Sequence, residues 1–482
     1  MEEVMLRWIG QTAAIRTDIL SVAGICLAVA VTVHVLLRKR EVGAAIGWIG
    51  LAWLSPFLGG SLYILFGVNR VTRRARRLRV KPSSPGQTRE GGQATAEVAA
   101  TAVLAPLDRV VGTITQLPLS PGNAVTPLRH GDEAYPMMLA AIGAARRSVV
   151  LSSYIMRDDR IGRTFVAALA GAKARGVEVR VLIDGIGSGY LISGIHRRLR
   201  RAGVPVARFM HSALPWRMPF LNLRSHKKLM IVDGEIAFTG GINIADANCL
   251  SARPSDPMRD THFRLVGPVV EQLVAAFASD WALADGEDLD GPVWFAPPSA
   301  GGPTSARVVT SGPDADLRKI ELVVLQAVAC ARRSIRLATP YFLPSEVLSS
   351  ALALAAGRGI AVDVIVPETS DHRLVDWATR AHVDPLLAAG VRIWLDTPPF
   401  DHSKILVVDE VWCFVGSANW DMRSFRLNFE LNVEIYDADL ARWLGAVMDE
   451  KTGALLTRED LARRSLPIRL RDASARLWLP YL

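Results

Sequence analysis

The chain has 482 residues, of which 50% are hydrophobic and 21% are charged, and its formal net charge is +9. This composition excludes a largely disordered chain, and the length predicts two or three domains. The positive charge is concentrated at the N-terminal end, because residues 1–81 contain 12 lysines and arginines against 4 acidic residues. The remaining residues are almost neutral, which argues against nucleic-acid binding by the bulk of the chain.

Two apolar stretches near the N-terminus predict a transmembrane helical hairpin within residues 1–69. They cover residues 19–37 and 43–68, and crossing a bilayer takes roughly 20 residues. Pro56 and the glycines that follow it predict a kink or a re-entrant course in the second stretch. The residues alone leave open a buried hairpin in a soluble domain, although the basic cluster that follows favours the membrane.

Basic residues beside these stretches predict their orientation. Three lie in the intervening loop, at residues 38–40, and nine lie on the outer flanks, including a cluster between Arg70 and Lys81. Because basic flanks stay in the cytoplasm, both ends of the hairpin and everything after it are expected there. The cluster is expected to contact anionic lipid headgroups, and residues 70–125 to form this basic segment and a linker.

An internal duplication follows and predicts two homologous α/β domains, residues 126–300 and 301–482. The sequence AIGAARRS at 141–148 corresponds to AVACARRS at 327–334, and each copy leads into an apolar strand. An Arg-Gly pair before a β-rich stretch and an Ala-Gly-Val turn then recur in the same order. This alternation of helices and strands predicts a mixed sheet flanked by helices in each domain.

Each copy also contains the pattern HxKxxxxD, followed by six residues and GxxN. The residues that form it are His226, Lys228, Asp233 and Asn243 in the first copy, and His402, Lys404, Asp409 and Asn419 in the second. Positions i and i+2 of a strand share a face, so each histidine and lysine is expected to point at one ligand. Asp233 and Asp409 belong to the candidate catalytic motif, although both are expected to shape the turn after an apolar strand, and Asp233-Gly234 resembles a tight hairpin turn.

The chemistry of the motif points to a phosphate group. Lysine ammonium and asparagine amide groups donate to phosphate oxygens, so two copies would surround one phosphorus atom. Duplication in register with the repeat argues against a chance surface pair. The four cysteines (Cys26, Cys249, Cys330 and Cys413) show no metal-ligand spacing, so neither a metal ion nor another cofactor is predicted.

On these residues the chain resembles the phospholipase D superfamily, and the order of its parts is similar to that of the bacterial cardiolipin synthases. Further matches are Asn222-Leu-Arg224, FTGGINIAD (238–246), RDTH (259–262) and GSANWDMRSFRLNFE (416–430). Met258 and Asp401 depart from the family pattern, in which Trp and Leu are common. The resemblance covers nearly the whole chain and implies a multi-pass protein of the bacterial inner membrane with cytoplasmic catalytic domains.

The resemblance also implies a reaction. A phosphatidyltransferase of this kind joins two phosphatidylglycerol molecules into cardiolipin and glycerol through a phosphohistidine. His226 is implied as the nucleophile and His402 as the acid and base, although the symmetry of the repeats leaves this assignment open. Asp260 and Glu430 are implied to orient the imidazoles. The implied phosphate-binding residues are Lys228, Lys404, Asn243 and Asn419.

Three alternative functions stay open on the residues: a phospholipase D that uses water as acceptor, a membrane-tethered nuclease, and an inactive lipid-binding scaffold. The intact pair of motifs argues against the scaffold, and the nearly neutral domains argue against the nuclease. Leu214–Leu221 is expected to dip into the membrane interface or to form a buried loop. Tyr341–Pro344 is expected to pack in the core or to line the cleft. The oligomeric state stays open.

Overall fold

The computed structural model describes residues 2–38, 42–67, 98–190, 192–211, 223–297, 299–313 and 316–478. Contacts within the chain divide it into two compact units, Met1–Arg74 and Ala75–Leu482. Each unit has its own buried core. The predicted basic cluster between Arg70 and Lys81 and the segment Leu214–Leu221 lie outside the described residues.

The N-terminal unit is helical and consists of α1 (Glu2–Arg38), α2 (Val42–Leu54), α3 (Pro56–Leu62) and the π-helical turn η1 (Tyr63–Gly67). Helices α2 and α3 fold back on α1 around a small buried core of Val31, Val35, Ala52 and Tyr63. The second apolar stretch breaks at Ser55, because the proline that follows cannot continue the hydrogen bonding of α2. Among the described residues, only Arg16–Arg38 forms a helix long and apolar enough to cross a membrane.

The C-terminal unit contains the strands of both sequence repeats. Those of the first repeat are β1 (Ser120–Arg129), β2 (Ser148–Ser153), β3 (Glu178–Asp184), β4 (Val206–Phe209), β5 (Arg224–Ser225), β6 (Leu229–Val232), β7 (Ile236–Gly240), β8 (Met258–Arg259) and β9 (Thr261–Val266). Those of the second are β10 (Thr304–Ser311), β11 (Ser334–Ala338), β12 (Phe342–Leu343), β13 (Ala361–Pro367), β14 (Arg392–Asp396), β15 (Phe400–Asp401), β16 (Ile405–Val408), β17 (Trp412–Gly416), β18 (Trp420–Asp421), β19 (Asn428–Tyr436) and β20 (Ala454–Leu456).

The two repeats have the same strand order, which confirms the predicted duplication of a mixed α/β unit. The first runs β1-β9-β7-β6-β2-β3-β4 and the second runs β10-β19-β17-β16-β11-β13-β14, with β20 added at the outer edge. In each repeat the last three strands of the order are parallel and the others are antiparallel. Antiparallel pairing of β1 with β10 joins both halves into one continuous sheet.

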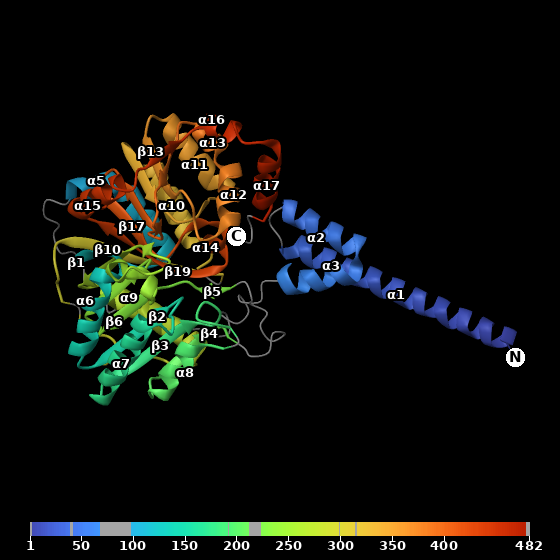
Figure 1. Ribbon diagram of the computed structural model, residues 1–482, viewed down its shortest axis with the longest axis horizontal. Coiled ribbons are helices and arrows are strands. Elements are labelled where there is room, and N and C mark those ends of the chain that lie inside the picture. The colour runs from blue at the N-terminus through green and yellow to red at the C-terminus, as the bar shows by residue number, and fades with distance from the viewer. Residues whose placement is uncertain are drawn as a thin grey trace. The chain divides into compact units, whose positions relative to one another are not determined.

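Helices flank this sheet in both halves, with the first repeat mainly green and the second orange to red (Figure 1). Those of the first repeat are α6 (His130–Ala144), α7 (Arg160–Ala174), α8 (Gly194–Arg201) and α9 (Val269–Ala284). Those of the second are α10 (Lys319–Cys330), α11 (Glu346–Gly357), α12 (Arg373–His382), α13 (Asp384–Ala388), α14 (Met422–Arg426), α15 (Ala438–Asp449), α16 (Arg458–Ala462) and α17 (Leu466–Arg476). Separate apolar cores lie in the first and second halves.

Part of the segment expected to be a linker forms a further helix, α5 (Val98–Thr115). Its side chains Leu104, Leu107 and Val111 follow helical spacing and are fully buried in the core of the second repeat. Arg307 of β10 ties the helix to the sheet, because its buried guanidinium donates to the Asp108 carboxylate of α5 at 2.7 Å. The second repeat is therefore completed by residues that precede the first.

Candidate active site

The strands β6 and β16 that follow the two histidine motifs are fully buried apolar segments, as predicted. Each continues through a tight turn into β7 or β17, and both central residues of each turn have positive φ. These residues are Asp233 and Gly234 in the first repeat, and Asp409 and Glu410 in the second. A turn with two left-handed residues matches the twist of paired strands, so the predicted hairpins are confirmed.

The motif aspartates hold the backbone of the repeated ARRS sequence. Asp233 accepts hydrogen bonds from the backbone N–H groups of residues 146–148, and Asp409 accepts them from residues 332–334. The four-residue strand between Lys228 and Asp233 spans roughly 13 Å, so this aspartate lies at the opposite end of β6 from the lysine. The contacts give both aspartates a role in folding the motif.

The catalytic candidates themselves lie before the strands that were expected to carry them. β6 begins only at Leu229, and the backbone of His226 pairs with the other repeat instead of its own sheet. β5 pairs in parallel with the start of β19, so the His226 N–H donates to the Phe429 carbonyl at 2.9 Å. β15 pairs with β8 in the same way, and the His402 N–H donates to the Arg259 carbonyl at 2.8 Å.

These short pairings bring each imidazole to a carboxylate of the opposite repeat. His226 Nδ1 lies 3.0 Å from Glu430 Oε2, and His402 Nδ1 lies 2.9 Å from Asp260 Oδ2. Both carboxylates are completely or almost completely buried. The two imidazole rings are 6.4 Å apart between centroids and nearly perpendicular. The two repeats therefore build a single site, and neither half contains a complete histidine–carboxylate pair.

The two lysines lie in the same site and are almost fully buried, with 2% of Lys228 and 3% of Lys404 exposed. Each ammonium group donates to the backbone carbonyl of the histidine two residues before it. No ion pair to a carboxylate within 4 Å is formed by either lysine in the described part of the chain. Two buried ammonium groups without a close counter-ion create a strong preference for an anionic ligand.

Burial also changes the protonation of the site. It lowers the pKa of Lys228 to about 7 and that of Lys404 to about 8, with each opposed by neighbouring carboxylates. Burial, and then the lysine charges, lowers the pKa of both imidazoles well below the usual value, which favours neutral histidines. Burial raises the pKa of Asp260 to about 7. Groups with such altered pKa values are typical of catalytic sites.

The two asparagines differ in their contacts. The side-chain oxygen of Asn243 accepts from the Ile155 N–H at 3.2 Å, whereas that of Asn419 is buried without a hydrogen-bond partner among the described residues. Gly240 and Gly241, which precede Asn243, lie close against the neighbouring strand β9 and the residue before it. A Cβ at Gly240 would lie 2.7 Å from the Thr261 carbonyl oxygen, and one at Gly241 would lie 2.1 Å from the Asp260 carboxylate. These glycines therefore make room for β9 and for the Asp260 carboxylate.

Aromatic residues complete the site, and the sequence did not identify one of them, Tyr154. The Tyr154 ring packs edge-on against the His226 ring at 4.8 Å, and the Lys228 ammonium lies 5.4 Å from the same ring centre. Tyr341 contacts His402 at 6.4 Å, so part of its predicted segment lines the site while Phe342 is buried. The signal was present, because both tyrosines follow the apolar strand of their repeat.

Several proteins of known function resemble this chain. The family model described as "Cardiolipin synthase, PLD-like domain" matches residues 138–281 and 324–451, and one described as "Phospholipase_D-nuclease N-terminal" matches residues 26–67. A cardiolipin synthase of Geobacillus kaustophilus is 31% identical over 95% of this chain and 92% of its own length. The major cardiolipin synthase of Bacillus subtilis is 32% identical over 96% of this chain and all of its own length.

A solved structure supports the fold. The phosphatidylserine synthase of Haemophilus influenzae has a TM-score of 0.57 and covers 78% of this chain and 100% of its own. Its sequence is 16% identical, so the likeness concerns the arrangement of helices and strands. The mixed α/β architecture of the C-terminal unit is therefore consistent with that of a solved structure.

Proposed function

The chain belongs to the cardiolipin synthases of the phospholipase D superfamily, and on this premise we propose that it transfers a phosphatidyl group between two phosphatidylglycerol molecules. The products of this reaction are cardiolipin and glycerol. The observation that carries the proposal is the pair of buried imidazoles, each backed by a carboxylate of the other repeat, beside two buried lysines.

We assign the nucleophile to His226 and the acid and base to His402. A carboxylate at Nδ1 favours the tautomer in which the other ring nitrogen, Nε2, carries the lone pair of a neutral imidazole. His226 is held in this way by Glu430, and its lowered pKa keeps it neutral near pH 7. Neutral imidazole is the form that attacks phosphorus, so this arrangement supports a nucleophilic role.

In the first step, His226 Nε2 attacks the phosphorus atom of phosphatidylglycerol and a new N–P bond forms. The bond from phosphorus to the glycerol oxygen breaks, and this oxygen takes a proton from His402 as glycerol leaves. His402 carries that proton in the substrate complex, because the negative phosphodiester offsets the lysine charges that lower its pKa. Lys228 and Lys404 stabilise the charge on the equatorial oxygens, with Asn243 and Asn419 as amide donors.

In the second step, a glycerol hydroxyl of another phosphatidylglycerol attacks the phosphatidyl-histidine. His402, now neutral, accepts the hydroxyl proton, the N–P bond breaks, and cardiolipin leaves with both histidines in their starting states. Burial of both histidines supports transfer to a lipid acceptor, because it limits the access of water to the intermediate.

We further propose that α1, α2 and α3 insert as a helical hairpin, with the catalytic unit on the cytoplasmic side of a bacterial inner membrane. Many large apolar side chains of the N-terminal unit are exposed, as lipid-facing residues would be. The basic residues on its outer flanks support the orientation. A cysteine introduced at Glu41 should react with a membrane-impermeant thiol reagent in intact cells, and one at Ser474 only after permeabilisation.

The test of the reaction uses the purified full chain with phosphatidylglycerol labelled separately in its glycerol headgroup and its acyl chains. We expect equal amounts of cardiolipin and free glycerol. Phosphatidic acid as the main product would instead identify a phospholipase D that uses water. Absence of any turnover of phosphatidylglycerol by a folded enzyme would leave the scaffold and nuclease alternatives.

A further inference from the structure

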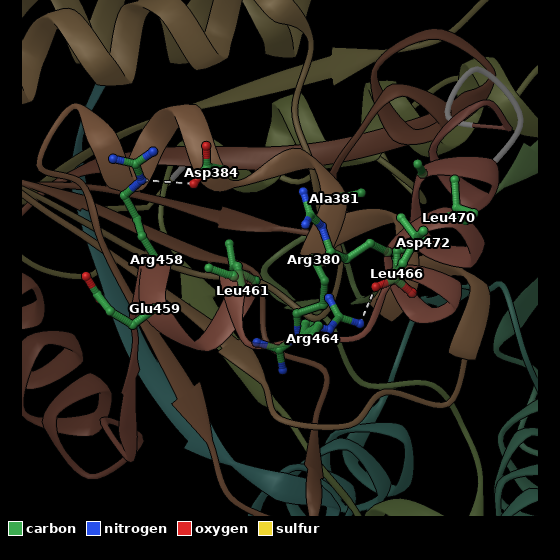
Figure 2. Close-up of a pocket in the computed structure, with 13 residues that line it drawn as sticks. Arg380, Ala381, Asp384, Arg458, Glu459, Leu461, Arg464, Leu466, Leu470 and Asp472 are labelled. Atoms are coloured by element: carbon green, nitrogen blue, oxygen red, sulfur yellow. Dashed lines mark hydrogen bonds and ion pairs between the residues drawn. The ribbon is translucent and has the colours of Figure 1, made fainter.

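A cavity of about 670 Å³ lies among four short helices of the second repeat, α12, α13, α16 and α17. Figure 2 shows its lining, with the Arg458–Asp384 pair at one end and the Arg464–Asp472 pair beside Leu466 and Leu470 at the other. None of its lining residues belongs to the histidine motifs or to their orienting carboxylates. The cavity is therefore a second concave site, and the proposed reaction does not use it.

The cavity has an excess of positive charge once its internal ion pairs are formed. Its four arginines are Arg380, Arg458, Arg464 and Arg469. Arg458 pairs with Asp384 at 2.9 Å, and Arg464 pairs with buried Asp472. The remaining two arginines share the lining with one acidic group, Glu459. An anion is thus the ligand that best balances the charge of this cavity.

Arg380 is the clearest unsatisfied cation of the cavity. It is half-buried, and its guanidinium makes one long hydrogen bond of 3.4 Å to the Glu368 carbonyl oxygen. Burial, and next the charge of Arg464, lowers the pKa of Arg380, and the nearby carboxylates offset this lowering only in part. Two oxygens of a tetrahedral phosphate group can accept a bidentate pair of hydrogen bonds from the planar guanidinium.

The rim of the cavity is apolar and exposed. Leu466 and Leu470, which line the cavity, are 66% and 59% exposed, and Leu477, which lies outside the cavity just after α17, is 78% exposed. A helix advances about 100° per residue, so these leucines lie within roughly 40° of one another. The opposite face of α17 is buried through Ala475, which packs in a cluster with Val375 and Ala378 of α12. The leucines are therefore exposed on the face of α17 opposite to the one that packs against α12. Such an exposed stripe of leucines indicates a partner with an apolar region.

The end of α17 has the side chains of a membrane-interface helix. Trp478 is 63% exposed directly after Leu477, and tryptophan favours the headgroup level of a bilayer. Arg469 and Arg476 lie beside the leucine stripe, where they can contact lipid phosphates while the leucines enter the acyl region. A soluble phosphate ester would use the arginines and leave the leucines in water.

We propose that this cavity binds the phosphate headgroup of an anionic phospholipid in the membrane surface, with the leucine stripe of α17 in the acyl-chain region. The site holds a lipid that is not reacting and fixes the second repeat against an anionic bilayer. It adds to the proposed function a lipid site away from the histidines. Lipid binding here needs no turnover, so the two proposals can fail separately.

The experiment measures hydrogen–deuterium exchange of the full chain in lipid nanodiscs. A His226→Ala background keeps the lipids intact, and the discs contain phosphatidylcholine alone or mixed with phosphatidylglycerol. We expect amides of Leu466–Arg476 to exchange several-fold more slowly in the anionic discs. Arg469→Gln should weaken this protection about fivefold, as for one basic residue at an anionic surface. Leu466→Ser with Leu470→Ser should weaken it as well.

Arg442→Gln is the matched control, because Arg442 is an exposed arginine of α15 that pairs with Asp439 outside the cavity. It should leave the protection of α17 unchanged. Exchange of β19 peptides in the same data shows whether each variant is folded. Equal protection in both kinds of disc, no protection in either, or equal protection by soluble glycerol phosphate without lipid would each overturn the proposal. Cardiolipin formation by the enzyme with an intact His226 is measured separately.

Discussion

The two repeats share their strand order, their hairpins and their histidine motifs, yet they support the two imidazoles differently. Glu430, which holds His226, also accepts from Ser417 Oγ at 2.6 Å and from Asn428 Nδ2 at 3.1 Å. Asp260, which holds His402, accepts from the Thr261 N–H at 2.7 Å, and Gly241 occupies the position that corresponds to Ser417. The first repeat therefore has an aspartate in place of Glu430 and a glycine in place of Ser417. The two changes are linked, because a Cβ at Gly241 would overlap the Asp260 carboxylate.

This difference distinguishes the roles of the two histidines in an otherwise symmetric site. A carboxylate fixed by several side-chain donors keeps its imidazole in one tautomer, which suits a nucleophile that must present the same lone pair throughout. A carboxylate with fewer side-chain donors leaves its imidazole freer to gain and lose a proton, which suits an acid and base. The comparison of repeats therefore supports the assignment of His226 as nucleophile, which the sequence alone left open.

The largest effects are expected from removing either imidazole. His226→Ala and His402→Ala should each lower cardiolipin formation by about 10⁴-fold or more, because one removes the covalent step and the other the proton transfers. Acid quenching followed by detection of protein-bound labelled lipid separates them. Only His402→Ala should accumulate the phosphatidyl-enzyme, since attack does not strictly need the acid but transfer to the acceptor needs the base.

The same assay can also contradict this assignment of the two histidines. Accumulation in His226→Ala and none in His402→Ala would exchange the two roles. The double variant is the control, because it should bind no lipid covalently.

Neutralising the orienting carboxylates should have the next largest effect. Glu430→Gln and Asp260→Asn are each expected to lower kcat by about 10²- to 10⁴-fold, because the amide no longer fixes the histidine tautomer. If the repeats differ as proposed, single-turnover measurements should show that Glu430→Gln slows formation of the phosphatidyl-enzyme. Asp260→Asn should mainly slow its breakdown. Equal effects of both substitutions on both steps would contradict the asymmetry.

Substitution of either lysine should lower kcat less than substitution of a carboxylate, and the two lysine substitutions should have similar effects. Lys228→Met and Lys404→Met are each expected to lower kcat by about 10²- to 10³-fold, the range for one donor to a charged transition state. Because burial lowers the pKa of Lys228 to about 7 and that of Lys404 to about 8, kcat/KM should fall in two steps as the pH rises through these values and the ammonium groups lose their protons. Lys404→Arg keeps the positive charge and should remove the upper step, even if its rate is lower. An unchanged upper step in Lys404→Arg would assign that step to another group.

Sequence reasoning found the parts of the site that are local and repeated. The pattern of apolar strands, turns and spaced polar residues identified both hairpins and both His-x-Lys pairs. It could not reveal that β5 pairs with β19 and β15 with β8, because these short pairings join residues far apart in the chain. The carboxylates were therefore known by resemblance, and their exchange between repeats is a result of the tertiary structure.

The sequence did not predict helix α5 or the ion pair that Asp401 forms. α5 lies in a stretch rich in Ala, Thr and Val after a Pro- and Gly-rich segment, and its buried face is set by docking on the second core rather than by strong helix propensity. Asp401, which departs from the family pattern, is buried and pairs with Lys451 at 2.6 Å. Burial opposes its ionisation, yet Lys451 and the Ser403 hydrogen bonds hold its pKa at about 2.

A smaller effect is expected from the hydroxyl that distinguishes the two repeats. Ser417→Gly removes one hydrogen bond to the Glu430 carboxylate without changing the histidine, and kcat should fall by about tenfold. Ser417→Ala is the steric control and should behave similarly, because it lacks the same donor. A pH profile measured on both variants should show a changed acid limb, which a mere loss of packing would leave in place.

The smallest effect on turnover is expected from the motif aspartates, where the two repeats behave alike. Each binds three consecutive backbone N–H groups at the start of β2 or β11, so Asp233→Asn and Asp409→Asn should lower the free energy of unfolding by about 2 kcal/mol or more. Thermal unfolding measures this loss, and activity per folded molecule should change less than about threefold, because neither carboxylate contacts the imidazoles. A loss of turnover in a fully folded Asp409→Asn enzyme would show that this aspartate takes part in the reaction. The two motif aspartates would then not share the same structural role.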